Sequence, residues 1–291
     1  MFINAIEEIS KFTRPVLTVT RQYDGTLTPG ASTLFFVNDE GVAITCRHVA
    51  DFLVQADSIN NLYNQFKAEK AAIPSGKKAR GQLQSLESKY KYKKNTIVEV
   101  LIQVLGVGDI TGITWHFHQN LDLAIITFNG LTNKLYTSHA TFINNENKVK
   151  AGKYLCRYGY PFPEFTNYRL NEETDRLEWT SEGNQNCPPF PIDGIVTRFI
   201  GTTDGITGLE ISTPGLRGQS GGPLFDEDGL VYGMQFATNH LHLGFDIKNM
   251  EIMSNGKKER VSNSPFLHVG YCVHVDRIKE FLRQNNISFY E

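Results

Sequence analysis

The stretch GLRGQSGGPLF, from Gly215 to Phe225, places four glycines around Ser220 and then passes directly into an apolar strand. A serine nucleophile needs backbone N–H groups that converge on an oxyanion, and glycine permits the tight curl that brings two of them together. Gly218 fits that need, and Gly221 and Gly222 would let a substrate backbone approach closely. The alternative is a glycine-rich turn between two strands. The choice depends on whether a base and an acid elsewhere in the chain can serve Ser220.

The residues that follow predict an all-β fold. PLFDEDGLVYGMQF (223–236) reads as a β-hairpin that turns at Asp226–Gly229. Short β-branched and aromatic segments recur along the chain, and many such segments with turn signals between them are typical of a β-sandwich or barrel. We expect further strands at 15–20, 32–37, 42–45, 96–105, 123–128, 154–160, 194–200 and 208–213.

Helical periodicity is confined to three places. A short amphipathic helix is expected at the N-terminus, and a helical hairpin is expected from 57 to 95, where IPSGKK separates two apolar stripes. The third helix covers 276–287, with Ile278, Phe281 and Leu282 on one face and Asp276 as its N-cap. The polar segments 171–193 and 239–266 are expected to be long surface loops.

Composition limits the possible partners and surroundings. The 291 residues are 40% hydrophobic and 21% charged, and the net charge of −2 provides no overall attraction for nucleic acid or anionic membranes. No run of about 18 apolar residues suggests a membrane span. The N-terminus lacks the pattern of a secretory signal, and Cys46, Cys156, Cys187 and Cys272 form no C-x-x-C pair. We therefore expect four free thiols and a cytoplasmic protein.

A candidate base and a candidate acid accompany Ser220. His48 follows the apolar strand 42–45, and Asp122 directly precedes the apolar strand 123–128. An aspartate beside a buried strand costs free energy unless it is hydrogen-bonded, which suits the acid that orients a catalytic histidine. Taken singly, His48 could be a structural residue and Asp122 a turn residue. Together the three occur in the order His, Asp, Ser.

The motifs FFVNDEGVAITCRHVA, LDLAIITF, YGYPF and GQSGGPLFDEDGLVYGMQF resemble the trypsin/chymotrypsin superfamily, in particular its bacterial, HtrA-like branch. The resemblance covers most of residues 15–285 and implies a serine endopeptidase with a double six-stranded antiparallel β-barrel. It assigns the general base to His48, the orienting acid to Asp122 and the nucleophile to Ser220. The N–H groups of Gly218 and Ser220 would then form the oxyanion hole. No cofactor is implied.

The resemblance also implies a domain organisation. Residues 1–291 would form one peptidase unit, with a first barrel at 15–145, a second barrel at 150–275 and a C-terminal helix at 276–287. Too few residues follow the barrels for the PDZ module of typical HtrA proteins. Secreted trypsins carry an aspartate before the nucleophile that pairs with a new N-terminal amine, whereas this chain has Gln219. We therefore expect activity without N-terminal cleavage.

Substrate recognition is expected to use Pro214, Met234, Gln235 and Phe236. No acid occurs from Ile211 to Gln219, so we expect a preference for uncharged, mostly apolar side chains before the cleaved bond. The basic segment 67–94 is a possible site for an acidic protein partner; nucleic acid is a less favoured partner. Two alternatives to a protease are a catalytically silent binding module and a metal site built on His116 and His118 or on His240 and His242. No third ligand has suitable spacing, and we expect no metal.

Overall fold

Two β-rich halves carry the fold in the computed structural model, which describes residues 1–144, 149–203, 205–254, 256–263 and 266–291. The first half is a six-stranded antiparallel sheet in the order β4-β1-β2-β3-β6-β5. Among the described residues its edge strands β4 and β5 are not paired with each other, so this sheet is open. Its strands are β1 (Thr13–Gln22), β2 (Leu27–Phe36), β3 (Val42–Thr45), β4 (Ile97–Val104), β5 (Gly112–Phe117) and β6 (Ala124–Asn129).

The second half is a closed six-stranded barrel in the order β10-β11-β16-β13-β12-β7. The all-β expectation with two six-stranded antiparallel units is thus confirmed, with closure of the second unit only. The barrel strands are β7 (Tyr154–Arg157), β10 (Ile192–Thr202), β11 (Gly205–Ile211), β12 (Pro223–Phe225), β13 (Val231–His242) and β16 (Phe266–His274).

One hydrophobic core joins the two halves. Phe35 of β2 lies near the linker residue Phe142, with 6.5 Å between the ring centroids. Phe142, Phe225 and Val231 are completely buried and belong to the same cluster. Burial of this much apolar surface across the junction stabilises one arrangement of the halves, so side chains from both can build a common site.

Two short helices pack on this body. Helix α1 (Ile3–Phe12) buries Ala5, Ile9 and Phe12, which confirms the amphipathic N-terminal helix. Helix α4 (Val275–Gln284) buries Ile278, Phe281 and Leu282 as expected. The expected cap was wrong: the His274 side chain accepts the Asp276 N–H, because Asp276 already lies inside the first turn.

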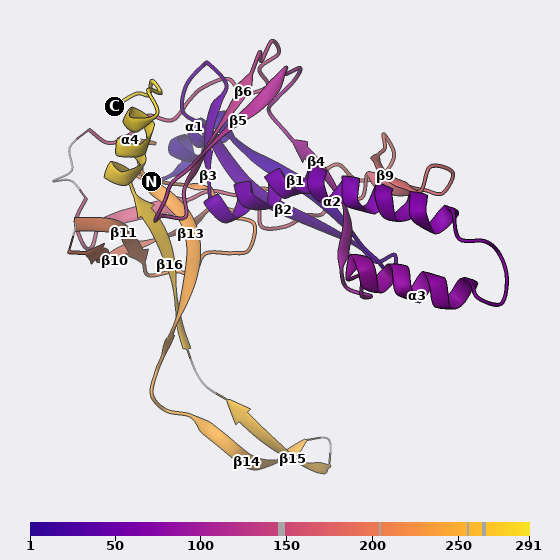
Figure 1. Cartoon of the computed structure of the whole chain (residues 1–291). Helices are drawn as coiled ribbons and strands as arrows, with labels where there is room; N and C mark the ends of the chain where they lie inside the picture. The colour runs from indigo at the N-terminus through magenta and orange to yellow at the C-terminus, as the bar shows by residue number, and fades with distance from the viewer. Residues whose placement is uncertain (145–148, 204, 255, 264–265) are drawn as a thin grey trace.

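The helical hairpin consists of α2 (Arg47–Ala71) and α3 (Ala79–Tyr90) and extends away from the sheets (Figure 1). Its first helix begins ten residues earlier than the sequence suggested, because Val49, Leu53 and Ala56 continue the buried stripe back to the end of β3. Phe66, only 1% exposed, is surrounded by rings from both helices and from the turn after β1. The Asn60 side chain both donates to and accepts from the Val100 backbone, so α2 covers part of the free edge of β4.

Two additional ribbons replace the expected surface loops. The pair β8 (Tyr168–Asn171) and β9 (Arg176–Trp179) lies near the hairpin, and the pair β14 (Ile247–Ser254) and β15 (Lys257–Asn263) forms a separate two-stranded sheet. Long extensions of β13 and β16 carry the second pair far from the body (Figure 1). The expectation of irregular loops at 171–193 and 239–266 was therefore wrong where these strands form. Most side chains of β14 and β15 are exposed, so the ribbon is held by cross-strand pairing and shows no alternating apolar pattern.

Candidate active site

His48 and Asp122 meet at one end of the first sheet. Antiparallel pairing of Thr45 with Ala124 places the residues after β3 beside those before β6. His48 lies in the first turn of α2, and its Nδ1 is 2.6 Å from Oδ2 of Asp122. The His48 backbone N–H donates to the other carboxylate oxygen at 2.9 Å. One carboxylate thus fixes both the ring and the backbone of His48, which leaves Nε2 as the nitrogen that can act on a substrate.

The environment of Asp122 keeps its carboxylate ionised. Burial alone would raise its pKa, but hydrogen bonds from the side chain and the backbone of His48 outweigh that effect, and the pKa lies below its ordinary value. An ionised Asp122 accepts a hydrogen bond from the Nδ1–H of His48 and stabilises the imidazolium that forms when His48 takes a proton.

Ser220 lies on a loop that is hydrogen-bonded to a strand of the first half of the molecule. The Thr33 N–H of β2 donates to the Ser220 carbonyl at 3.0 Å, and the Thr33 hydroxyl donates to the Gly218 carbonyl at 2.7 Å. Gly218 has φ +94°, and a Cβ there would collide with the Tyr160 carbonyl. This position requires glycine, because an L side chain rarely adopts that φ and would have no room.

The same loop leaves two N–H groups without a protein acceptor. The Gly218 and Ser220 carbonyls are both used by Thr33, whereas neither N–H donates to any group in the part of the chain that the structure describes. Donors that are fixed in place and unpaired before reaction can stabilise a developing oxyanion without reorganisation. This is the arrangement expected for the two oxyanion-hole residues.

His48, Gly218 and Ser220 line one open cavity of about 220 Å³. Thr18, Ala31 and Ser32 of the first sheet form the facing wall, together with Phe52 of α2. Within the described residues, the Ser220 hydroxyl makes no direct hydrogen bond to His48. Catalytic hydrogen bonds are often long without substrate and tighten when it binds. The cavity therefore brings His48 and Ser220 together, and Asp122 joins them through its contact with His48.

The buried side chain of Gln219 fixes the loop before Ser220 through hydrogen bonds inside the protein. Its side chain is fully buried; its amide oxygen accepts the Leu216 N–H at 3.0 Å, and its amide group donates to the Phe190 carbonyl at 2.8 Å. Both ends of the amide are thus paired inside the protein. Met1 is 90% exposed and takes no part in this contact.

The four residues expected to contact substrate have different surroundings. Met234 is fully buried in the hydrophobic core, and Gln235 is only 2% exposed. Pro214 and Phe236 are partly exposed, and the Phe236 ring lies 6.3 Å from that of Tyr271. Gln235 is hydrogen-bonded through its backbone to Gly221 and Gly222, so it lies directly behind the Ser220 loop.

Cys46 is a poor alternative nucleophile or metal ligand. Cys46, His48 and Asp122 are the one group of three possible ligand side chains within 4.8 Å of one another in the described residues. Burial raises the pKa of the Cys46 thiol well above its ordinary value, and its Sγ donates to the Gln235 carbonyl at 3.3 Å. A protonated thiol is neither a strong nucleophile nor a metal ligand.

The paired histidines have other contacts. Nδ1 of His118 accepts the backbone N–H of Leu121, and Nε2 of His242 lies 2.7 Å from Asp246. His240 contacts His268 on the neighbouring strand. Neither pair joins a group of three ligands within the described ranges.

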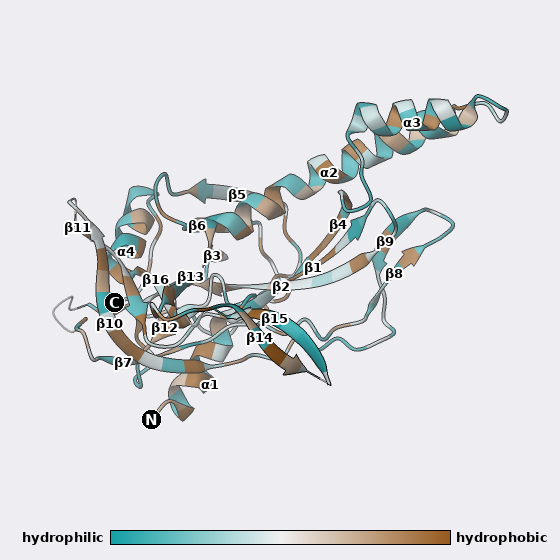
Figure 2. Cartoon of the chain, turned by 90° about the horizontal axis from the view of Figure 1, so that it is seen from below, coloured by the Kyte–Doolittle hydropathy of each residue, from teal (hydrophilic) through white to brown (hydrophobic). Residues whose placement is uncertain are grey.

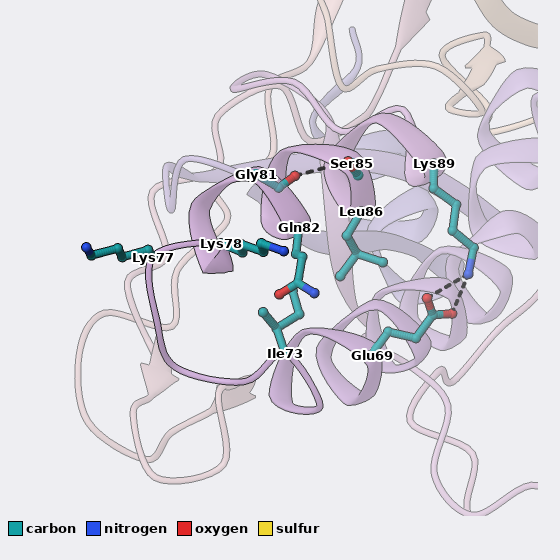
Figure 3. Close-up of a pocket in the computed structure, with 9 residues that line it drawn as sticks. All are labelled: Glu69, Ile73, Lys77, Lys78, Gly81, Gln82, Ser85, Leu86 and Lys89. Atoms are coloured by element: carbon teal, nitrogen blue, oxygen red, sulfur yellow. Dashed lines mark hydrogen bonds and ion pairs between the residues drawn. The ribbon is translucent and has the colours of Figure 1, made fainter.

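A larger cavity of about 780 Å³ lies on the helical hairpin (Figure 3), and Ser220 is not among its lining residues. It is lined by Glu69 of α2, by Lys77 and Lys78 of the connecting loop, and by one side of α3, which includes Leu86. Lys89 is bound to Glu69 at 2.6 Å, as Figure 3 shows, whereas Lys77 and Lys78 form no ion pair within the described residues. The hairpin therefore presents unpaired positive charge beside an open groove.

A family model described as a trypsin-like peptidase domain matches residues 31–234. The chain belongs to the trypsin-like peptidase family. The matched range includes His48, Asp122 and Ser220, and the predicted family is confirmed. Membership supports a peptidase activity on protein or peptide substrates.

Comparison with solved structures gives a remote match to this trypsin-like peptidase. The active form of the Rv3671c protease from M. tuberculosis matches with a TM-score of 0.48 and 12% identity, over 99% of this chain and 86% of that chain. No curated protein sequence matches the chain. Within the described residues, no helix has both the length and the apolar character needed to cross a bilayer.

Sequence reasoning missed two residues of this trypsin-like site. Thr33 holds the Ser220 loop, and Arg157 lies buried behind Gln235. The sequence carries one signal for Arg157: a charged residue inside the apolar strand at 154–160. The sequence carries no signal for Thr33, because threonine is a common residue in strands.

Proposed function

We propose that this protein is a serine endopeptidase. Ser220 attacks the substrate carbonyl, His48 takes the hydroxyl proton and later gives it to the leaving amine, and Asp122 holds the ring in the required tautomer. The Gly218 and Ser220 N–H groups stabilise the oxyanion in the tetrahedral intermediate. Attack yields an acyl-enzyme and releases the amine, and water, activated by His48, then releases the acid and restores Ser220.

The observation that carries this proposal is the contact between His48 and Asp122 beside Ser220. The 2.6 Å bond at Nδ1 commits that nitrogen to the acid, and the shared cavity gives Nε2 access to the nucleophile. A structural histidine would need neither an ionised aspartate at Nδ1 nor a cavity shared with a serine and two free N–H groups.

We also propose that the intact chain is competent without N-terminal cleavage. In secreted trypsins, a new N-terminal amine pairs with the aspartate before the nucleophile. Here the internal contacts of Gln219 already order the loop before Ser220. The cytoplasmic location remains a prediction.

A serine-reactive fluorophosphonate tests the proposed chemistry directly. We expect covalent labelling of the full-length protein at Ser220, with labelling lost in Ser220→Ala and strongly reduced in His48→Ala. Ser32 lines the same cavity and provides a matched control, since Ser32→Ala should still be labelled. Labelling that persists in Ser220→Ala would contradict the proposal.

A catalytically silent binding module is the second candidate. The unpaired basic residues beside the groove of the hairpin favour it, because an acidic partner could bind there without any chemistry at Ser220. Failure of the probe, together with binding of an acidic protein to the hairpin, would favour this candidate.

A further inference from the structure

Arg157, at the end of β7, is a buried cation that forms no ion pair within the described residues; the Asp193 carboxylate acts on it only from beyond ion-pair distance. It is the bulkiest of the fully buried side chains, with no exposed surface. Its guanidinium forms no ion pair with any carboxylate in the described residues, and its Nε lacks a hydrogen-bond partner there. Buried charges are usually paired, because an unpaired one loses its hydration without compensation.

The guanidinium lies between the two segments that flank the nucleophile loop. One Nη donates to Oε1 of Gln235 on β13 at 2.8 Å, and the other donates to the Thr213 carbonyl at 3.0 Å, seven residues before Ser220. The Thr238 hydroxyl joins the same two segments by donating to the Gly215 carbonyl at 2.6 Å. Arg157 therefore links the two segments from behind the nucleophile loop.

Two glycines pack closely against the Arg157 and Gln235 side chains. A Cβ at Gly270 would collide with the guanidinium, and one at Gly215 would collide with the Gln235 amide. The Gln235 amide thus stands between the loop and Arg157 and occupies one of the guanidinium's donor positions. A neutral amide oxygen is a weaker acceptor for a guanidinium than a carboxylate, which can bind two N–H groups at once.

Burial lowers the pKa of Arg157, but a guanidinium remains protonated in proteins. The site therefore keeps a positive charge in low dielectric, where an entering anion gains far more than it would at the surface. Arg217, which lines the open cavity beside Ser220, is exposed to solvent. Screening by water and salt leaves it little selectivity.

We propose that Arg157 makes this protein selective for an acidic side chain, glutamate or aspartate, immediately before the cleaved bond. The substrate carboxylate displaces the Gln235 amide and binds the guanidinium between Thr213 and Gln235. This inference rests on the proposed function, names its substrate class, and replaces the sequence-based expectation of uncharged side chains.

Two measurements test the proposal. In the first, wild type is given internally quenched peptide libraries that differ only in having Glu, Gln, Leu or Lys before the cleaved bond. In the second, Ser220→Ala is titrated with the same peptides, unquenched and labelled for fluorescence anisotropy. A charged hydrogen bond that glutamine cannot replace predicts about 10- to 100-fold faster cleavage of the Glu library than of the Gln library. Binding should show the same order.

Three variants assign the effect. Arg157→Met should remove the Glu preference while the Gln library is still cleaved. Gln235→Glu keeps Arg157 but places an internal carboxylate beside it. This variant should have a higher Tm than wild type and should lose the preference for Glu. It provides the same test if Arg157→Met does not fold. Arg217→Gln is the matched control and should keep the preference.

Faster cleavage of the Leu or Lys library by wild type would overturn the inference. So would loss of the Glu preference in Arg217→Gln, or an unchanged preference in Gln235→Glu. These results leave fluorophosphonate labelling of Ser220 intact, so they differ from failure of the proposed function. If labelling and cleavage both fail, Glu-selective binding to Ser220→Ala still supports the role of Arg157, and unselective binding contradicts it.

Discussion

At the residue scale, the proposed mechanism predicts that Ser220, His48 and Asp122 act as one unit. His48 is bound to Asp122 and lines a cavity with Ser220, so loss of either His48 or Ser220 removes the same step. Ser220→Ala and His48→Ala should each lower kcat by about 10⁶-fold, and the double variant should be little worse. Steady-state rates on one peptide substrate measure this. Losses that multiply in the double variant would show that the residues act separately.

Asp122→Asn tests the orienting contact. An amide can donate to Nδ1 and stabilise the wrong tautomer, so kcat should fall by about 10⁴-fold while KM changes little. A large rise in KM with an unchanged kcat would instead indicate a role in substrate binding.

The lowered pKa of Asp122 also has a consequence for stability. Its folded pKa lies below the unfolded value of about 3.9, so the ionised carboxylate stabilises the fold above that pH. The contribution is lost as the pH falls through the folded pKa. The Tm difference between wild type and Asp122→Asn should therefore be larger near about pH 5 than near about pH 2. A difference that grows on acidification would contradict the assigned hydrogen bonds.

At the scale of elements, the loop before Ser220 depends on one amide. Gln219→Leu keeps an apolar volume but leaves the Leu216 N–H and the Phe190 carbonyl without their partner. We expect loss of activity on peptides by about 10-fold or more, from disorder of the oxyanion hole, with the barrel still folded by circular dichroism. Intact wild type should be active as purified. An inert wild type that gains activity on N-terminal trimming would contradict the role given to Gln219.

The helical hairpin is the second element with a testable role. Lys77, Lys78, Lys91 and Lys93 are exposed and unpaired within the described residues, whereas Lys89 is bound to Glu69 and is better left unchanged. Replacing the four with glutamate should slow cleavage of an acidic protein substrate and spare a short peptide, with the difference shrinking as salt rises. The four lysine-to-arginine changes form the matched control and should behave as wild type. Equal effects on both substrates would make the hairpin a structural addition only.

Figure 2 shows that α3 carries interspersed hydrophilic and hydrophobic residues, consistent with a helix that packs on one face only.

Across the whole molecule, Thr33 couples the halves. Its hydroxyl donates to the Gly218 carbonyl and accepts the Tyr160 N–H at 3.1 Å, both buried. Thr33→Val keeps the shape but leaves both groups unpaired, which should destabilise the protein by about 2–4 kcal/mol. Denaturant unfolding measures this. The activity should fall more than in Thr18→Val, the same substitution at a threonine that lines the cavity. Equal activities would show that Thr33 contributes to folding alone.

The sequence was informative where local chemistry determines structure. The glycines around Ser220, the apolar strands beside His48 and Asp122, and the stripes of the helices all carry local patterns. The β14–β15 ribbon was missed because exposed strands lack such a pattern. The early start of α2 was missed because its first turn directly follows the apolar strand β3. Arg157 carries a local signal, a charged residue in an apolar strand, but only the assembled barrel reveals that it has no ion pair within the described residues.

The continuity of α2 has a consequence for how far apart a docking segment and a cleavage site must be. Lys70 follows His48 by 22 residues on one unbroken helix, which at about 1.5 Å per residue separates them by about 33 Å. An extended chain covers about 3.3 Å per residue, so a substrate held at the far end of α2 needs a spacer of about ten residues to reach Ser220. The length of α2 therefore sets the spacer length that a bound substrate needs. A substrate with a shorter spacer cannot bind the far end of α2 and Ser220 at the same time. A much longer spacer lowers the effective concentration of the cleavage site at Ser220.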